Sequence, residues 1–414
     1  MAGELHVFTS AAVNYLPKVR ILCRSIRRHH PEAVIHLALA DLCPEWLVTE
    51  GEPFDHLIDL ADLGIPDWKR WAFGHDVVEL ATAIKPFALA KLLAVPECGT
   101  VLYFDPDIVL FSRVDDILAI LAHSNLALTP HQTQPEATLE AVLDNEVASL
   151  KHGIFNLGFI GVTNSDESLR FARWWGERTY ALCRADVRNG LFTDQKWVNF
   201  APVFFDGVAI VKSPRHNVAT WNLTTRAMTG DFAGGFFIDD EPLGFYHFTG
   251  FDSGAHRIMV IKNATRNASV RELIAWYERE IDIAGNDPVS RTPWAFGRYS
   301  DGTRIEAWQR RLYRDRADLH DSFPDPFDAT AGNAKSDRAS YLRWCMAEGR
   351  FLHSDGDGTL RVPLRGGAAL RLAALALAPR AGRSLRQRVL RILRTEGLSG
   401  IARRLRLRRR RLSP

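Results

Sequence analysis

The strongest constraint on the fold is an alternation of short apolar runs with amphipathic segments along the first 150 residues. The runs of strand character cover residues 5–9, 34–40, 100–104 and 126–129. The segments of helical character cover residues 15–28, 77–94, 114–122 and 136–150. This order predicts an α/β fold, in which helices cover both faces of a sheet and ligands bind at the carboxyl ends of the strands. No G-x-G-x-x-G follows the first strand and no G-x-x-x-x-G-K-[ST] occurs, which argues against dinucleotide enzymes and P-loop NTPases.

The chain divides into three parts by composition. With 414 residues, of which 46% are hydrophobic and 24% charged, it has enough material for a large core. We expect a sheet domain over residues 1–265 and a helical or irregular extension, rich in aromatic residues, over 266–360. Residues 361–414 form a basic tail with sixteen arginines and a single acid, Glu396.

The basic tail alternates leucine and isoleucine with arginine, as an amphipathic helix does. Such a helix can lie on an anionic membrane surface. Nucleic acid would attract the same charges, but the tail has no aromatic residues for base stacking, so we favour the membrane and expect no nucleic acid partner. A solvated, disordered extension is the alternative.

Location is predicted from what the sequence lacks. The first residues carry no secretory signal pattern, and no run of about 18 apolar residues could span a membrane. We therefore expect a cytoplasmic protein, peripheral on the inner face of the plasma membrane if the tail binds lipid. The five cysteines are odd in number and lack metal-ligand spacing, so we interpret them as reduced core thiols: Cys23, Cys43, Cys98, Cys183 and Cys345.

Two carboxylates mark the end of the apolar run at residues 100–104. Asp105 and Asp107 flank Pro106, and two carboxylates at the exit of a buried strand can hold a hard divalent cation whose remaining positions take phosphate oxygens. The tripeptide alone is a weak signal, because Pro106 could simply shape a surface turn. Its apolar strand context favours a metal site.

Three further segments, in order along the chain, make the sequence resemble the GT-A glycosyltransferases, most closely the retaining family 8 type. Residues 155–162, with Asn156 and Gly158, are similar to that family's Asn-x-Gly strand beside the donor sugar. The Asp194-Gln195 pair is similar to its Asp-Gln segment, and residues 247–250 to its His-x-x-Gly. The resemblance implies a GT-A fold, a Rossmann-like mixed sheet covered by helices, with a C-terminal helical extension.

The resemblance also implies a role for each matching residue. Asp105, Asp107 and His247 would hold Mn²⁺ or Mg²⁺, and Asp194 and Gln195 would be catalytic. The residues implied to contact the nucleotide-sugar donor are Thr9, Ser10, Tyr15, Lys85, Asp105, Asn156, Gly158, His247 and Gly250. Ordinary structural roles are open at several of these positions: a helix cap for Asp194, a packed ring for His247 or Tyr15, and a solvated side chain for Lys85.

One departure from the family pattern affects the diphosphate. Family 8 proteins usually follow the glycine with Lys-Pro-Trp, whereas here Gly250 is followed by Phe-Asp-Ser-Gly. A cation for the diphosphate is therefore unassigned, with His256, Arg257 and Lys262 as candidates, and a sister family is favoured over family 8 itself. A catalytic base is not required for retention, although Asp194, Asp239 or Asp240 could serve as one.

These features predict transfer of a sugar from an NDP-sugar, and UDP is the nucleotide we expect, to a hydroxyl of a glycan or lipid-linked acceptor, with retention. One alternative is a haloacid-dehalogenase-like phosphatase, in which Asp105 would be the nucleophile and Asp239 and Asp240 would supply the metal pair. Another is a non-catalytic carbohydrate-binding protein on the same fold. Residues 323–327 and 340–344 are similar to a segment appended to glycosyltransferases of bacterial surface-polysaccharide clusters, which could cover the acceptor cleft or pack C-terminal helices.

Overall fold

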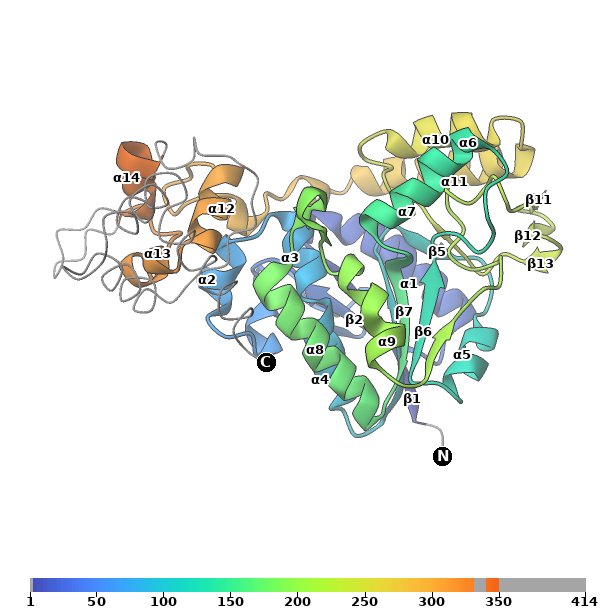
Figure 1. Ribbon diagram of the computed structural model, residues 1–414, viewed down its shortest axis with the longest axis horizontal. Coiled ribbons are helices and arrows are strands. Elements are labelled where there is room, and N and C mark those ends of the chain that lie inside the picture. Colours follow the sequence, from blue (N-terminus) through green and yellow to red (C-terminus); the bar gives the residue numbers. More distant parts are fainter. Residues whose placement is uncertain (1–2, 331–339, 350–414) are drawn as a thin grey trace, which may run out of the picture. The chain divides into compact units, whose positions relative to one another are not determined.

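The computed structural model describes residues 3–330 and 340–349 (Figure 1). These residues form two compact units. Of the described residues, the first unit contains 3–68 and 77–296, and the second contains 69–76, 297–330 and 340–349. The basic tail at 361–414 lies outside the described residues, so its helix and its membrane binding stay predictions.

A seven-stranded sheet with the order β10-β6-β7-β4-β1-β2-β3 is the centre of the first unit. Its strands are β1 (Glu4–Ala11), β2 (Val34–Leu39), β3 (His56–Ile58), β4 (Cys98–Phe104), β6 (Leu126–Pro130), β7 (Phe155–Thr163) and β10 (Val208–Ile210). Strand β7 pairs antiparallel with β4 on one side and with β6 on the other, and the remaining pairs are parallel. The α/β class and the mixed sheet are confirmed.

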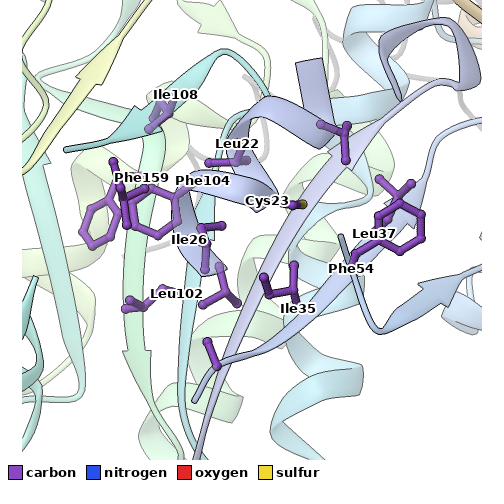
Figure 2. Close-up of a cluster of buried hydrophobic side chains, with 14 of the residues drawn as sticks. Leu22, Cys23, Ile26, Ile35, Leu37, Phe54, Leu102, Phe104, Ile108 and Phe159 are labelled. Atoms are coloured by element: carbon purple, nitrogen blue, oxygen red, sulfur yellow. The ribbon is translucent and has the colours of Figure 1, made fainter. Parts of the chain in front are cut away.

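Two groups of helices cover the two faces of the sheet. Helices α1 (Leu16–His29) and α5 (Asp115–Leu121) pack on the face that carries Leu37, Leu102 and Phe159 (Figure 2). Helices α4 (Lys85–Leu93) and α8 (Asp166–Leu182) lie side by side (Figure 1), and Lys85 of α4 reaches the ring of Tyr103. Because side chains alternate along a strand, Tyr103 and Leu102 point to opposite faces, so both faces of the sheet are covered.

The predicted helices agree with the structure except where the backbone interrupts them. The segment predicted at 77–94 is two helices, α3 (Val77–Ala83) and α4, since Pro86 lies in the first turn of the second one. The segment predicted at 136–150 begins as α6 (Leu139–Ala141), widens into the π-helical turn η3 (Val142–Glu146) and ends as α7 (Val147–His152). Asn267 caps α11 (Ala268–Gly285) through its side chain, and this helix, predicted to belong to the C-terminal extension, lies in the first unit.

Smaller elements complete the first unit. The short strands β5 (Ile108–Leu110) and β14 (Phe245–His247) pair antiparallel. A three-stranded sheet consists of β11 (Met228–Asp231), β12 (Gly235–Ile238) and β13 (Glu241–Pro242). The remaining elements are η1 (Val13–Tyr15), η2 (Leu60–Leu63), β8 (Ala185–Asp186), η4 (Val187–Asn189), β9 (Leu191–Phe192), η5 (Gln195–Phe200), α9 (Ala201–Phe204), α10 (Ala255–Ala264), η6 (Pro288–Arg291) and η7 (Ala295–Gly297).

The second unit has its own aromatic core. Its helices are α12 (Ala307–Asp315), α13 (Ala317–Ser322), α14 (Tyr341–Trp344) and η8 (Cys345–Gly349), together with most of α2 (Trp68–Phe73). The Phe73 ring contacts the rings of four residues: Tyr299, Tyr313, Phe327 and Tyr341. The segments at 323–327 and 340–344 therefore contribute to the packing of this unit.

Two other sequence expectations concern cysteines and membrane spans. All five cysteines are free, and four of them are buried, but Cys43 is exposed, so its assignment to the core was wrong. Cys43 lies shortly after β2 in a turn-rich connection, where its thiol is open to solvent. Within residues 3–330 and 340–349, no helix is long and apolar enough to cross a bilayer.

Candidate metal and donor site

The two aspartates lie where β4 leaves the sheet. The Asp105 N–H donates to the Gly158 carbonyl on β7, and the Ile108 N–H donates to the Asp105 carbonyl, which closes a tight turn around Pro106. Asp107 directly precedes β5, whose partner β14 ends with His247 opposite Ile108. The β5–β14 pairing thus brings the imidazole to the carboxylates from a distant part of the sequence.

The three predicted metal ligands converge. His247 Nε2 lies 3.1 Å from Asp107 Oδ1 and 3.8 Å from Asp105 Oδ2. One ligand atom from each side chain lies within 4.8 Å of the others, and this is the one such group of three among the described residues. Two carboxylate oxygens and an imidazole nitrogen suit Mn²⁺ or a similar divalent cation.

Asn156 fixes the tautomer of His247. Its Oδ1 accepts the Gly158 N–H at 3.2 Å, which identifies this atom as the amide oxygen. The same oxygen lies 3.1 Å from His247 Nδ1, so Nδ1 must donate. His247 Nε2 therefore either carries a second proton or presents its lone pair to a cation between itself and the aspartates.

The charges around His247 agree with a cation at this position. Burial of the ring lowers the pKa of His247, but the attraction of the Asp107 and Asp105 carboxylates outweighs it, so this pKa lies above its usual value. Burial raises the pKa of Asp107, but the charge of His247 outweighs burial and lowers the pKa below its usual range. A positive charge at Nε2 is therefore favourable, and either a proton or a metal ion would supply it.

His131 continues this chain of hydrogen bonds. Its Nδ1 lies 3.2 Å from the Ile154 carbonyl and must donate to it, which leaves Nε2 to accept the Asn156 Nδ2–H at 3.3 Å. Burial lowers the pKa of His131 to about 4, so the ring is neutral at pH 7. His131 was not predicted from the sequence, because a lone histidine outside any motif carries no signal.

Lys85 is buried between two carboxylates. Its Nζ lies 3.1 Å from Asp105 Oδ1 and 3.3 Å from Asp194 Oδ2, and it donates to the Leu157 carbonyl at 3.0 Å. Burial lowers the pKa of this ammonium, but the two carboxylates outweigh burial and raise it well above its usual value. Lys85 is predicted to contact the donor, yet three protein oxygens already surround its three N–H groups.

Asp194 and Gln195 are also buried. Asp194 stands before η5, but its side chain makes no cap bond there, so the expectation that it caps the helix was wrong. It accepts instead from the Thr193 hydroxyl at 3.1 Å, and burial raises its pKa. Gln195 Oε1 accepts the Leu157 N–H at 2.9 Å and Nε2 donates to the His152 carbonyl at 3.1 Å. This side chain therefore connects β7 to the end of α7.

The end of β1 reaches the same site through a hydroxyl relay. Tyr103 donates to Asp105 Oδ1 at 2.5 Å, and Ser10 Oγ lies 3.0 Å from the Tyr103 hydroxyl. Thr9 Oγ1 is buried without a hydrogen-bond partner among the described residues. Tyr103 was missed by the sequence analysis because it stands inside an apolar strand, where a tyrosine is usually part of the core.

Tyr15 leads to a third residue that was not predicted from the sequence, Lys18. Its hydroxyl donates to Asp252, and the same carboxylate pairs with Lys18 Nζ at 2.6 Å. Lys18 Nζ lies 4.6 Å from the centre of the Tyr15 ring, and its charge acts on Asp107. Helical spacing brings Lys18 close to Tyr15, but its link to Asp252 depends on residues 234 positions apart.

The three candidate cations for the diphosphate, His256, Arg257 and Lys262, have different surroundings. Lys262 pairs with Glu140 and Asp144. Burial lowers the pKa of His256 to about 4, so it is neutral at pH 7. Arg257 is exposed on α10. Lys18 is thus a cation near Asp107 that the sequence did not single out.

The two predicted glycines have different structural reasons. A Cβ on Gly158 would lie 2.5 Å from His247 Cε1, so this glycine makes room for the His247 ring. Gly250 has a φ of 72°, a left-handed conformation that favours glycine in the turn after β14.

Asp239 and Asp240 do not contribute to this chemistry. Both are exposed in the turn between β12 and β13, and neither belongs to a group of possible metal ligands among the described residues. The Ala227 N–H donates to Asp239 Oδ1 at 3.0 Å. The phosphatase alternative therefore loses its acidic pair.

Two known proteins are similar to this chain in sequence. No family model matches the chain. Both relatives are uncharacterized proteins of Bacillus subtilis (strain 168): YfnD is 25% identical over 60% of this chain and 78% of its own, and YfnF is 26% identical over 42% of this chain and 58% of its own.

Solved structures give a second comparison. The galactosyltransferase LgtC, in complex with donor and acceptor sugar analogs, is 16% identical, with 68% of this chain and 95% of its own covered and a TM-score of 0.40. The chain is similar to glycosyltransferases. GlyE of Streptococcus pneumoniae TIGR4, also a glycosyltransferase, is 16% identical, with coverage of 72% and 67% and a TM-score of 0.40. The chemistry assigned to this chain rests on its own side chains.

Proposed function

We propose that the chain is a metal-dependent glycosyltransferase that moves a sugar from an NDP-sugar, with UDP as the expected nucleotide, to a hydroxyl of a glycan or lipid-linked acceptor. The observation that carries the proposal is the convergence of Asp105, Asp107 and His247 on one point, with the His247 tautomer set by Asn156. A Mn²⁺ or Mg²⁺ ion held there would neutralise the diphosphate as it leaves.

The reaction breaks the bond between the anomeric carbon and the diphosphate oxygen, and the NDP leaves with the electron pair. The acceptor hydroxyl oxygen forms the new bond to the anomeric carbon, and its proton passes to the departing diphosphate. We propose retention, with departure and attack on the same face of the sugar. This course needs no dedicated base, which fits an Asp194 already paired with Lys85.

Protein side chains supply the rest of the site in this proposal. Lys18, whose Nζ pairs with Asp252 and whose charge lowers the pKa of Asp107, would add positive charge beside the diphosphate. Tyr15 would contact the nucleoside, with Thr9, whose buried hydroxyl has no hydrogen-bond partner among the described residues, beside it. Gln195 accepts the Leu157 N–H and so would help to fix the position of the neighbouring Asn156. The membrane-binding tail and a location on the inner face of the plasma membrane remain part of this proposal.

The test measures NDP release from a panel of nucleotide sugars with and without Mn²⁺. We expect metal-dependent NDP release that the chelator EDTA abolishes and that Asp107→Asn lowers by at least about a hundredfold. Asp115→Asn is the matched control, because Asp115 is an exposed aspartate whose pairing with Arg113 contributes little. Equal NDP release by Asp107→Asn and the native chain would overturn the metal site.

A thermal-shift measurement on the same samples distinguishes a transferase from a non-catalytic carbohydrate-binding protein. A ligand that binds the folded chain stabilises it whether or not it reacts. Stabilisation by UDP-sugar and Mn²⁺ without NDP release, across acceptors, would favour the binding protein.

A further inference from the structure

A cavity lies in the first unit, lined by none of the residues assigned to the metal or the donor. Its volume is about 310 Å³, and it opens between α1, β5, the β11–β12 hairpin and α11. Helix α1 contacts both β5 and α11, and α11 contacts β11, so these elements lie next to one another. A volume of this size is in the range of small-ligand pockets.

The floor of the cavity is aromatic. Trp276 of α11 packs edge-on against Phe111 at a ring separation of 5.8 Å and lies 5.3 Å from Phe232. Phe232 remains 44% exposed, although it is a large apolar side chain in a hairpin. Aromatic rings that line an open cavity offer a flat surface to the apolar face of a pyranose ring.

The rim of the cavity carries charges with no protein partner. Arg24 and Arg28 stand one turn apart on α1, and neither makes an ion pair or hydrogen bond with the described residues. Glu280, on α11, is equally unpaired within the described part of the chain. Guanidinium groups bind carboxylates through paired hydrogen bonds, and a free carboxylate accepts hydrogen bonds from sugar hydroxyls.

We propose that this cavity binds an acidic saccharide unit, a pyranose with a carboxylate, as a non-catalytic subsite of the chain. The aromatic floor packs against the apolar face of the pyranose ring, and Arg24 and Arg28 bind its carboxylate. Glu280 accepts a hydrogen bond from one of its hydroxyls. The lining also contains the carboxylates of Asp231 and Glu280, which would repel a multiply charged phosphate more strongly than a singly charged carboxylate held by the two arginines. That the bound saccharide belongs to the acceptor rests on the proposed function, whereas the binding itself does not.

Strand β5 gives this subsite a connection to the metal site. Its first residue follows Asp107, and its last precedes Phe111, which lines the cavity. A glycan held at Phe111 and Trp276 would remain tethered to the enzyme between transfers, which raises its effective concentration at the metal site.

The test uses isothermal titration calorimetry on the full chain, with tetragalacturonate as the acidic probe and maltotetraose as the neutral one. We expect tetragalacturonate to bind, and Arg28→Ala to weaken its binding by at least about tenfold. Arg279→Ala is the matched control, because Arg279 is exposed on α11 outside the cavity, and its affinity should stay within about twofold of the native value. Arg24→Ala is the second variant. It is preferred to Trp276→Ala because Arg24 is exposed, so its removal does not disturb packing.

Three results would overturn the assignment: no heat of binding with tetragalacturonate at millimolar concentration, an equal loss in Arg28→Ala and Arg279→Ala, or equal binding of maltotetraose. Asp107→Asn separates the two proposals. If that variant and the native chain both bind tetragalacturonate but neither releases NDP, the subsite stands and the proposed transferase fails. If the native chain releases NDP but binds no tetragalacturonate, the transferase stands and the subsite fails.

Discussion

The ammonium of Lys85 lies 3.3 Å from Asp194 and 3.1 Å from Asp105, at a position where the lysine side chain is 2% exposed. A charge this deep is stable only with its partners, because water cannot replace them. The buried ammonium therefore links α4 to the turn that carries Asp105 and Asp107.

Lys85→Met should destabilise the chain by on the order of 3 kcal/mol, because it leaves Asp194 buried without a cation. Urea unfolding measures the loss. The double variant Lys85→Met with Asp194→Asn should recover part of it, since the second change removes the stranded charge. Lys91→Met, at an exposed lysine of the same helix, should stay within about 0.5 kcal/mol of the native chain. Equal losses in the two single variants would contradict the pairing.

Asn156→Leu should weaken Mn²⁺ binding by about ten- to a hundredfold, because it removes the oxygen that orients His247. Titration of free Mn²⁺ by electron paramagnetic resonance measures this directly. Asn156→Asp keeps an acceptor at the same place and should retain most of the affinity. An unchanged Mn²⁺ affinity in Asn156→Leu would show that the tautomer of His247 is not set here.

Gly158→Ala should lower both stability and Mn²⁺ affinity, because its Cβ would stand 2.5 Å from His247 Cε1 and must displace the ring. We expect a loss of about 1–3 kcal/mol in thermal unfolding. Gly176→Ala is the matched control: its Cβ meets Phe87 no closer than 3.5 Å, and alanine favours the interior of α8. A Gly158→Ala chain that binds Mn²⁺ normally would argue against the placement of His247.

Acid should destabilise the chain through a row of stacked histidines on β1, β2 and β3. His6 Nδ1 lies 2.9 Å from His36 Nε2, and the His36 ring stacks on His56 at 5.0 Å. Burial, together with His6 and His56, lowers the pKa of His36 to about 3, against a modest opposing effect of Asp55. For His6, burial outweighs Glu4 and Glu97, and its pKa is lowered too.

A histidine with a lowered folded-state pKa binds fewer protons than its unfolded form, so stability falls as the pH drops below about 6.5. If His36 stays neutral in the folded chain, the free energy of unfolding should fall by up to about 2 kcal/mol between pH 6.5 and pH 5. Urea midpoints at pH 7 and pH 5 measure the difference, and His36→Gln should reduce it. A pH dependence that is the same in His36→Gln as in the native chain would exclude this row as its source.

Local sequence patterns predicted most of the fold but not its long-range pairings. Helix α1 and strand β4 were placed within two residues, because hydrophobic periodicity is a local property. The antiparallel insertion of β7 between β4 and β6 joins segments far apart in the chain, and periodicity does not encode such pairings.

The site was predicted to a similar extent. The convergence of Asp105, Asp107 and His247 agrees with the motif order, and their role as metal ligands stays a prediction. The surroundings were not predicted: Lys18 is held by Asp252, and His131 lies behind Asn156. The first contact joins α1 to the turn after β14, and the second joins the end of β6 to the start of β7, so both depend on packing between separate segments.

The aromatic cluster around Phe73 has a consequence for any attempt to separate the two units. Residues 69–76 are flanked in sequence by the first unit but pack with the second, so the polypeptide passes between the units more than once. A protein expressed with a stop codon after residue 296 would keep Phe73 and lose all four of its ring partners. Excising the C-terminal region cleanly therefore requires replacing the 69–76 loop with a short linker as well, and a simple truncation is expected to yield an aggregation-prone product.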